Sequence, residues 1–262
     1  MNKMSIYNYL EEKKAKGEKI LSVFLTAGYP QKENFIQLAL GVLESGADML
    51  ELGVPFSDPL ADGPVIQASS AQAIKNGVTL NDVFAFCTEI KKRTQKPVVI
   101  MSYLNPLFHY GAGRFFEDYK KCNADGLILP DLIPEELPQF DEFGIPAEEL
   151  AAFAAPTTPQ ERLQYIDSRR WSFLYYVGML GTTGQAGAYS DEQIEKVRSV
   201  YSQIRNNKML VGFGISGPED VKKIREHCDG VIVGSLIIKK LAEHPGKFEP
   251  VYSIVSALKN GL

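Results

Sequence analysis

Short apolar segments alternate along the chain with longer amphipathic ones. Eight segments are apolar nearly throughout, which is typical of a parallel sheet whose outer face is covered by helices. The segments between them carry apolar residues at helical spacing, as in 34–44, where Phe35, Leu38 and Val42 share one face. The predicted strands cover residues 19–26, 48–54, 97–103, 125–131, 150–154, 172–177, 209–213 and 230–233.

Eight strand–helix units in 262 residues predict an α/β fold, a single-domain (β/α)8 TIM barrel over 1–262, with an extra N-terminal helix at 5–16. A doubly wound sheet is the competing arrangement, but no GxGxxG motif follows any strand. No linker, repeat or low-complexity tract divides the chain. The other predicted helices cover 34–44, 67–76, 80–93, 107–122, 135–143, 159–168, 191–204, 218–227, 236–241 and 248–258.

Composition narrows the class of protein. The chain is 45% hydrophobic and 23% charged, an ordinary globular mixture. Its net charge of -4 offers no basic stripe for nucleic acid, and no apolar run reaches the length of a membrane span. The N-terminus lacks the apolar core of a signal peptide, and the three cysteines form no CxxC motif, so we expect reduced thiols and a cytoplasmic location. The three histidines form no metal-binding pair, so we expect no metal.

Two carboxylates stand out in the segment LELGVPFSDPLADGPVIQ at 50–67. Glu51 lies among the apolar residues of a strand, and Asp62 lies in a loop framed by proline and glycine. Prolines at 55, 59 and 64, with Gly63, predict that the segment forms neither helix nor strand from Pro55 onward. Carboxylates are rarely fully buried unless they are paired or functional. The structural alternative makes Glu51 a partly exposed residue at a strand end and Asp62 a turn former or helix cap.

The carboxyl-terminal strand ends are where barrels place their active sites. Glu51, Tyr103, Asp131 and Tyr175 fall at or near these ends. Glycine-rich turns follow the seventh and eighth strands and contain Gly214, Gly234 and Ser235. Barrels often bind phosphate at this place through loop amides and a helix N-terminus. The alternative is that these glycines only turn the chain.

An apolar lining accompanies the carboxylates. It consists of residues at or near strand ends, which form either plain barrel core or a pocket for a flat apolar ring. A Schiff-base mechanism requires a lysine inside the site, whereas Lys19 opens the first strand and faces the opposite end of the barrel. The remaining chemistry is carboxylate acid–base catalysis. The lining residues are Phe24, Met101, Tyr103, Ile128, Tyr175 and Phe213.

These residues together resemble the tryptophan synthase alpha chain family from end to end. The segment at 50–67 is close to the family signature, and FLTAGYP, LPD, GTTG, GFGIS and VGS at 24–30, 129–131, 181–184, 212–216 and 233–235 also match. The resemblance implies a lyase of tryptophan biosynthesis (EC 4.2.1.20 type) that cleaves indole-3-glycerol phosphate to indole and glyceraldehyde 3-phosphate by retro-aldol chemistry. It also implies a hetero-oligomer, an α2β2 tetramer in which the beta chain, and not this chain, carries pyridoxal phosphate.

The resemblance also assigns roles to residues. Glu51 becomes the general acid/base at indole C3 and the glycerol hydroxyl, Asp62 the acceptor of the indole N–H, and Tyr175 a support for Glu51. An apolar site raises the pKa of a glutamate so that it holds a proton near pH 7, whereas a loop aspartate is expected to stay ionised. Thr183 orders a loop over the site. The resemblance assigns phosphate binding to Gly184, Gly214, Gly234 and Ser235. It assigns the indole pocket to Phe24, Met101, Tyr103, Ile128, Thr183 and Phe213.

The chain departs from the family pattern in two places. The sequence QAGA stands at 185–188, where the family usually has a basic residue nearby. The segment 146–154 contains more acidic and small residues than a regular fifth strand would, so we expect a short or irregular strand there. Two other functions stay open: a stand-alone indole-releasing lyase, and a non-catalytic barrel that only activates a beta subunit. The presence of both Glu51 and Asp62 argues against the non-catalytic barrel.

Overall fold

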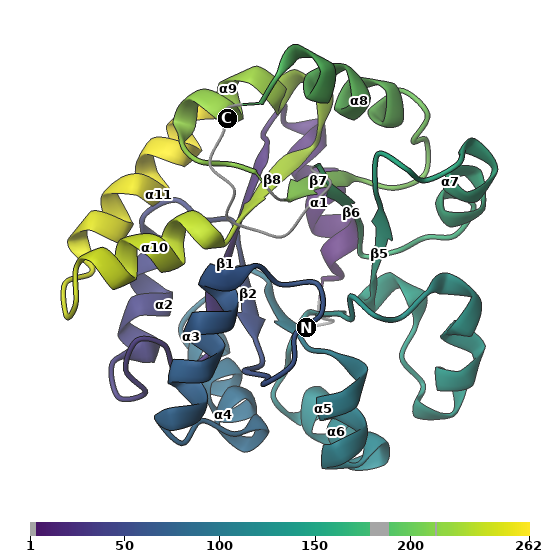
Figure 1. Ribbon diagram of the computed structural model, residues 1–262. Helices are drawn as coiled ribbons and strands as arrows, with labels where there is room; N and C mark the ends of the chain where they lie inside the picture. Colours follow the sequence, from purple (N-terminus) through teal and green to yellow (C-terminus); the bar gives the residue numbers. More distant parts are fainter. Residues whose placement is uncertain (1–3, 179–188, 213) are drawn as a thin grey trace.

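Eight parallel strands form a nearly closed barrel surrounded by helices (Figure 1). The computed structural model describes residues 4–178, 189–212 and 214–262. The strand order is β4-β3-β2-β1-β8-β7-β6-β5, and the predicted TIM barrel is confirmed. The strands are β1 (Ile20–Thr26), β2 (Met49–Gly53), β3 (Val98–Met101), β4 (Gly126–Ile128), β5 (Ala151–Ala154), β6 (Phe173–Val177), β7 (Met209–Gly212) and β8 (Gly230–Val233).

The barrel closes most weakly between β4 and β5. A single bridge, between Leu127 and Leu150, joins these two strands in the described part of the chain. A turn of 3-10 helix at Ala147–Glu149 leads into β5, which has four residues. The expected short, irregular fifth strand is therefore confirmed.

The helices agree with the predicted positions except in two regions. The segment predicted as one helix at 107–122 is two, because Gly111 between them has a φ of 95°, which interrupts helical geometry. The α-helices are α1 (Ile6–Ala15), α2 (Phe35–Glu44), α3 (Pro64–Lys75), α4 (Leu80–Lys91), α5 (Leu104–Tyr110), α6 (Ala112–Lys121), α7 (Gln160–Asp167), α8 (Asp191–Tyr201), α9 (Pro218–Ile224), α10 (Ser235–Glu243) and α11 (Glu249–Gly261). The 3-10 helices are η1 (Pro134–Phe143), η2 (Ala147–Glu149) and η3 (Arg225–His227).

The second disagreement concerns the loop after β2. The prolines were expected to exclude helix throughout this segment, yet α3 begins at Pro64 with Gly63 as its N-cap. Proline is tolerated at the first helical position because the N–H that it lacks has no partner inside the helix. The loop that carries Asp62 is therefore shorter than expected and ends directly at a helix.

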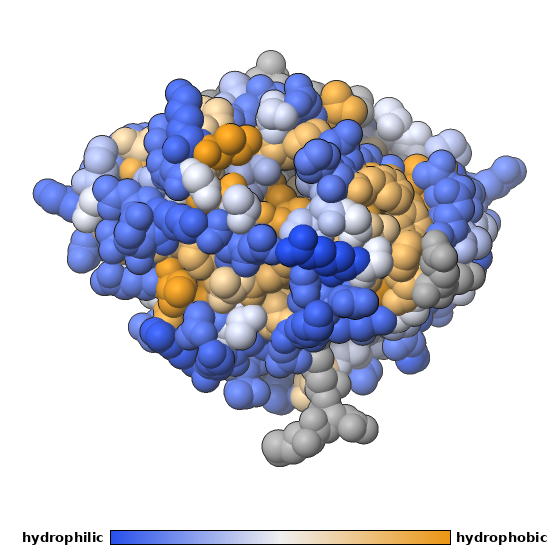
Figure 2. Space-filling view, turned by 90° about the horizontal axis from the view of Figure 1, so that it is seen from below, coloured by the Kyte–Doolittle hydropathy of each residue, from blue (hydrophilic) through white to orange (hydrophobic). Residues whose placement is uncertain are grey.

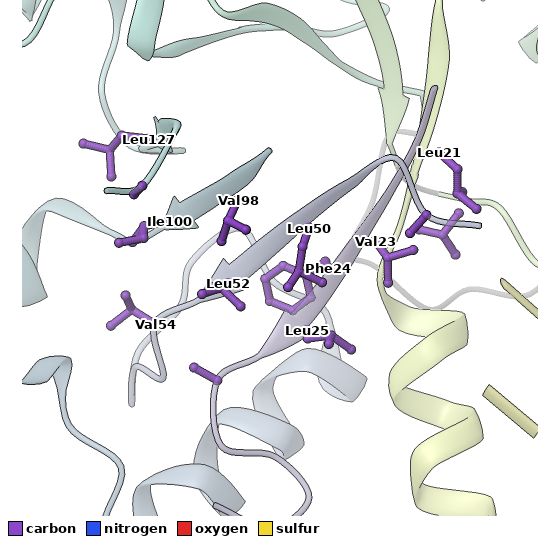
Figure 3. Close-up of a cluster of buried hydrophobic side chains, with 14 of the residues drawn as sticks. Leu21, Val23, Phe24, Leu25, Leu50, Leu52, Val54, Val98, Ile100 and Leu127 are labelled. Carbon is purple, nitrogen blue, oxygen red and sulfur yellow. The ribbon is translucent and has the colours of Figure 1, made fainter. Parts of the chain in front are cut away.

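Two layers of apolar side chains hold the barrel together. One lies between the strands and the outer helices and includes Leu21, Val23 and Leu25 of β1 (Figure 3). The other fills the barrel lumen with the strand residues whose side chains point inward, such as Ile20 of β1 and Met49 of β2. The view of Figure 2, taken from the side where α3 to α6 lie in Figure 1, shows apolar patches separated by hydrophilic residues.

The N-terminal helix α1 packs against the amino-terminal end of the lumen. Its buried residues Ile6 and Leu10 are each 1% exposed and belong to the lumen cluster. Gly126 of β4 leaves room for this contact, because a Cβ there would lie 2.6 Å from Ile6 Cδ1. The helix therefore covers the end of the barrel that lies opposite the candidate site.

Replacing Leu10 by alanine is expected to lower the free energy of unfolding by about 2–5 kcal/mol, the usual cost of truncating a buried leucine. The chemistry of the candidate site at the opposite end of the barrel should stay near the wild-type rate, because α1 lies away from the carboxyl ends of the strands. Chemical denaturation of Leu10→Ala beside Glu12→Ala, at an exposed position of the same helix, measures the difference. Equal stability of the two variants would contradict a packing role for α1.

Candidate active site

Glu51 lies inside the barrel lumen. It is the third of five residues of β2, and its side chain is 0% exposed. The Ser22 hydroxyl of β1 donates a hydrogen bond of 2.7 Å to Oε1, while Oε2 is buried without a hydrogen-bond partner in the described residues. Burial raises the pKa of Glu51 to about 7, and the Ser22 hydrogen bond acts in the opposite direction. The alternative of a partly exposed strand-end residue is therefore wrong, since the strand continues to Gly53.

Asp62 lies in the loop between β2 and α3, next to Tyr103. The Tyr103 hydroxyl accepts a hydrogen bond of 3.1 Å from the backbone N–H of Ala61 and interacts with the Asp62 carboxyl. Burial raises the pKa of Asp62 to about 6, and the hydrogen bond with Tyr103 lowers it. The pKa of Asp62 is thus higher than expected for a loop aspartate, but Asp62 remains a stronger acid than Glu51. It is not a helix cap, because Gly63 holds that position.

Tyr175 of β6 lies within electrostatic range of both carboxyl groups. It is buried, and its ring stacks on Phe153 at a centroid distance of 5.0 Å. Burial raises the pKa of Tyr175 most, followed by the negative charges of Glu51 and Asp62. Both carboxyl groups therefore lie close enough to Tyr175 for their charges to act on its hydroxyl.

Four of the predicted pocket residues belong to the described part of the chain. Ladder pairing aligns Met101 of β3 with Gly53 of β2 and with Ile128 of β4. The ring of Phe24 occupies the space over Gly53, where a Cβ would lie 2.3 Å from Phe24 Cζ. Ile128 is fully buried and Met101 half-buried. Tyr103, the fourth, joins them through its contact with the Asp62 loop.

The predicted phosphate residues lie at the ends of β7 and β8. Gly214 has a φ of 81°, a backbone conformation that favours glycine. Gly234 is the N-cap of α10, and Ser235 is its first residue, so the free N–H groups of this helix start beside the barrel. A Cβ on Gly234 would lie 3.2 Å from Phe24 Cβ, which places this helix end next to the predicted ring pocket. Gly184, Thr183 and Phe213 lie outside the described residues.

Sequence reasoning missed two contacts of the candidate site. It did not identify Ser22 as the partner of Glu51, and it assigned Tyr103 to a ring pocket without its hydrogen bonds to the Asp62 loop. The available signal was a polar residue within the apolar first strand. Without the pairing of β1 with β2, that signal does not say which residue Ser22 contacts.

No group of three or more histidine, cysteine or acidic side chains among the described residues is arranged to bind a metal ion. No described helix has the length and apolar character needed to cross a membrane.

The fold and the site define a TIM-barrel enzyme with one carboxyl group in its lumen and a second in the loop that follows β2. The profile of the tryptophan synthase alpha chain family matches residues 10–260. A tryptophan synthase alpha chain from Desulfosudis oleivorans is 41% identical over 89% of this chain and 88% of its own, and one from a Thermoanaerobacter species is 40% identical over 95% and 96%. The chain therefore belongs to the tryptophan synthase alpha chain family and is a lyase of tryptophan biosynthesis.

Solved structures agree with this assignment. The tryptophan synthase alpha chain of Legionella pneumophila superposes with a TM-score of 0.86 at 32% identity, covering 98% of this chain and 97% of that one. Tryptophan synthase from Mycobacterium tuberculosis gives a TM-score of 0.84 at 28% identity, with 98% and 97% covered.

Proposed function

We propose that this chain cleaves indole-3-glycerol phosphate to indole and glyceraldehyde 3-phosphate, with Glu51 as general acid and base and Asp62 as the charged partner of the indole nitrogen. The observation that carries the proposal is the Glu51 carboxyl: it is fully buried, held through one oxygen, and its pKa of about 7 lets it exist in both protonation states near neutral pH. A group that must first give and then take a proton works best at such a pKa.

The two proton transfers balance. Glu51 gives its proton to C3 of the indole, and the positive charge that develops on the ring is stabilised by ionised Asp62, which accepts the N–H. The Glu51 carboxylate then takes the proton of the glycerol hydroxyl next to the ring. The C–C bond breaks, its electron pair returns to the indole, and the hydroxyl carbon becomes the aldehyde. Glu51 ends protonated, ready for another turnover.

The two ends of the substrate, the phosphate and the indole ring, are proposed to bind at separate places in the site. The phosphate is held by the backbone at Gly214, Gly234 and Ser235, where the start of α10 supplies N–H groups and a partial positive charge. The indole lies among Phe24, Met101 and Ile128. Gly184, Thr183 and Phe213 keep their assigned roles as part of this proposal.

The partner is proposed to be a tryptophan synthase beta chain that carries pyridoxal phosphate, in an α2β2 assembly, while this chain itself uses no cofactor. Three large apolar residues after neighbouring strands support a partner surface at the barrel mouth: Leu60, Phe108 and Ile133 are 90%, 56% and 45% exposed. Exposed apolar groups that lie near one another commonly mark protein contacts.

Indole release by the purified chain, measured with and without a beta chain, tests the proposal. We expect indole from indole-3-glycerol phosphate in both assays. Release only when a beta chain is present would tie activity to the complex and remove the stand-alone enzyme. Activation of a beta chain without any release of indole would leave a non-catalytic barrel and contradict the proposed function.

The pH dependence of kcat/KM is expected to be bell-shaped, with its maximum between pH 6 and 7. Activity requires ionised Asp62, so it falls as pH drops through about 6; it also requires protonated Glu51, so it falls as pH rises through about 7. Initial rates of indole release from pH 5 to 9 measure both limbs. A profile that rises steadily to pH 9 would contradict an acid role for Glu51.

A further inference from the structure

A serine hydroxyl lies against the Glu51 carboxyl on the lumen side of β1. Ser22 is fully buried, and its Oγ donates to Glu51 Oε1 at 2.7 Å. Ladder pairing aligns Glu51 with Phe24 and Ser22 with Met49, so Ser22 lies two residues nearer the amino-terminal end of the barrel. It therefore reaches the carboxyl from the side away from the barrel mouth.

The contact makes the two oxygens of Glu51 unequal. Oε1 accepts the Ser22 hydrogen bond, whereas Oε2 has no partner in the described residues although it is buried. An oxygen that already accepts a hydrogen bond is the less favourable place for a proton. A neutral Glu51 consequently carries its proton on Oε2, the oxygen left for another molecule to meet.

We propose that Ser22 is a positioning residue that fixes Oε1 of Glu51 and so directs the transferable proton to Oε2. This inference rests on the proposed function and adds to it the residue that orients the Glu51 carboxyl group. A serine that only filled space would leave Glu51 free to rotate and to exchange its proton between both oxygens. With the hydrogen bond in place, one carboxyl geometry serves both the protonation of C3 and the removal of the hydroxyl proton.

The surroundings of Glu51 allow the Ser22 contact to be isolated. The titratable group near it is Tyr175 of β6, on which the charges of Glu51 and of Asp62, from the loop after β2, both act. On β3 the ladder partner of Glu51 is the apolar Val99. A Ser22 variant changes none of these groups, so a changed titration of Glu51 reports the loss of the hydrogen bond.

Ser22→Ala is expected to lower kcat about 10-fold, by analogy with the lower range for removing a residue that orients a metal-binding side chain. Because the hydroxyl stabilises the carboxylate, its loss should also move the alkaline limb of the pH profile upward by about one pH unit. An unmoved alkaline limb would overturn the proposal. Ser22→Cys, which retains only a weak donor, is expected to move the limb in the same direction and serves if the alanine variant does not fold.

Two further variants separate positioning from packing. Ser22→Thr keeps a hydroxyl on a residue that suits a strand, and its pH profile should return toward that of the wild type. Ser172 is also buried, and its Oγ has no hydrogen-bond partner in the described residues. Ser172→Ala is therefore a matched control that should leave both kcat and the pH profile unchanged. A threonine variant that behaves like alanine would contradict the hydrogen-bond argument.

A measurement without turnover separates this inference from the proposed function. Carbon-13 NMR of the Glu51 carboxyl, assigned by its absence in Glu51→Gln, reports the titration of Glu51 directly in the wild type and in Ser22→Ala. We expect the midpoint to rise in Ser22→Ala. An unshifted midpoint together with inactive Glu51→Gln would remove Ser22 alone. A shifted midpoint together with active Glu51→Gln would instead remove the proposed function while leaving the hydrogen bond intact.

Discussion

Glu51→Gln is expected to lower kcat for indole release by about 10²–10⁴-fold, the range for losing a general acid or base. Glutamine keeps the shape of the side chain, and its amide oxygen can still accept the Ser22 hydrogen bond. It cannot give a proton to C3 or take one from the hydroxyl. KM should therefore change little, and indole-3-glycerol phosphate should still bind, as measured by isothermal titration calorimetry. Wild-type turnover in this variant would remove Glu51 from the mechanism.

The same variant is expected to be more stable than the wild type at alkaline pH. The pKa of Glu51 is raised from 4.5 to about 7 in the folded protein, so between these values the folded state keeps a proton that the unfolded chain has lost. Wild-type stability contributed by Glu51 thus falls as pH rises through this window. At about 1.4 kcal/mol per pKa unit, the penalty above pH 7 amounts to about 3 kcal/mol. Glutamine does not titrate and avoids it.

Thermal unfolding of both proteins from pH 5 to 8 measures this difference. The gap in Tm should be small at pH 5 and widen as pH rises. Glu12→Gln, at an exposed position of α1, is the control and should show no such widening. A gap that stays constant with pH would show that Glu51 is not buried in its charged form. Activity lost and stability gained in one variant would identify a functional carboxylate rather than a structural one.

The barrel was predictable from the sequence because its signal is local. Each strand is a short apolar run, and the observed bounds differ from the predicted ones by at most three residues at either end, as for β4, which ends at Ile128 rather than at 131. Glu51 was recognisable as a carboxylate inside such a run. Its depth was not, since that depends on where β2 ends and on which face of the strand turns inward.

The contacts that tune the site were not predictable, because they join distant segments. Ser22 reaches Glu51 across 29 residues, and Tyr103 reaches Ala61 across 42. Both depend on the ladder pairing of neighbouring strands, and one sequence does not specify that pairing. The start of α3 was missed for a different reason: Pro64 was taken as a breaker, although proline suits the first turn of a helix.

Asp62→Asn is expected to lower kcat by about 10²-fold, the scale of losing one electrostatic contact to the charge of a transition state. Asparagine still accepts the indole N–H, so KM should change little, but it offers no negative charge to the protonated ring. The acid limb of the pH profile should also disappear. Its disappearance would assign the acid limb to Asp62 and not to the substrate phosphate, which also titrates near pH 6.

Tyr103→Phe provides the matched comparison for Asp62→Asn. It keeps the Asp62 charge but removes the hydroxyl that accepts from Ala61 and lowers the pKa of Asp62. Its acid limb should therefore move to higher pH rather than vanish. Steady-state rates of the two variants from pH 5 to 9 distinguish loss of the charge from loss of its support. If Asp62→Asn keeps both the acid limb and a kcat near that of the wild type, Asp62 only shapes the loop, and the charge on the ring must be stabilised by another group.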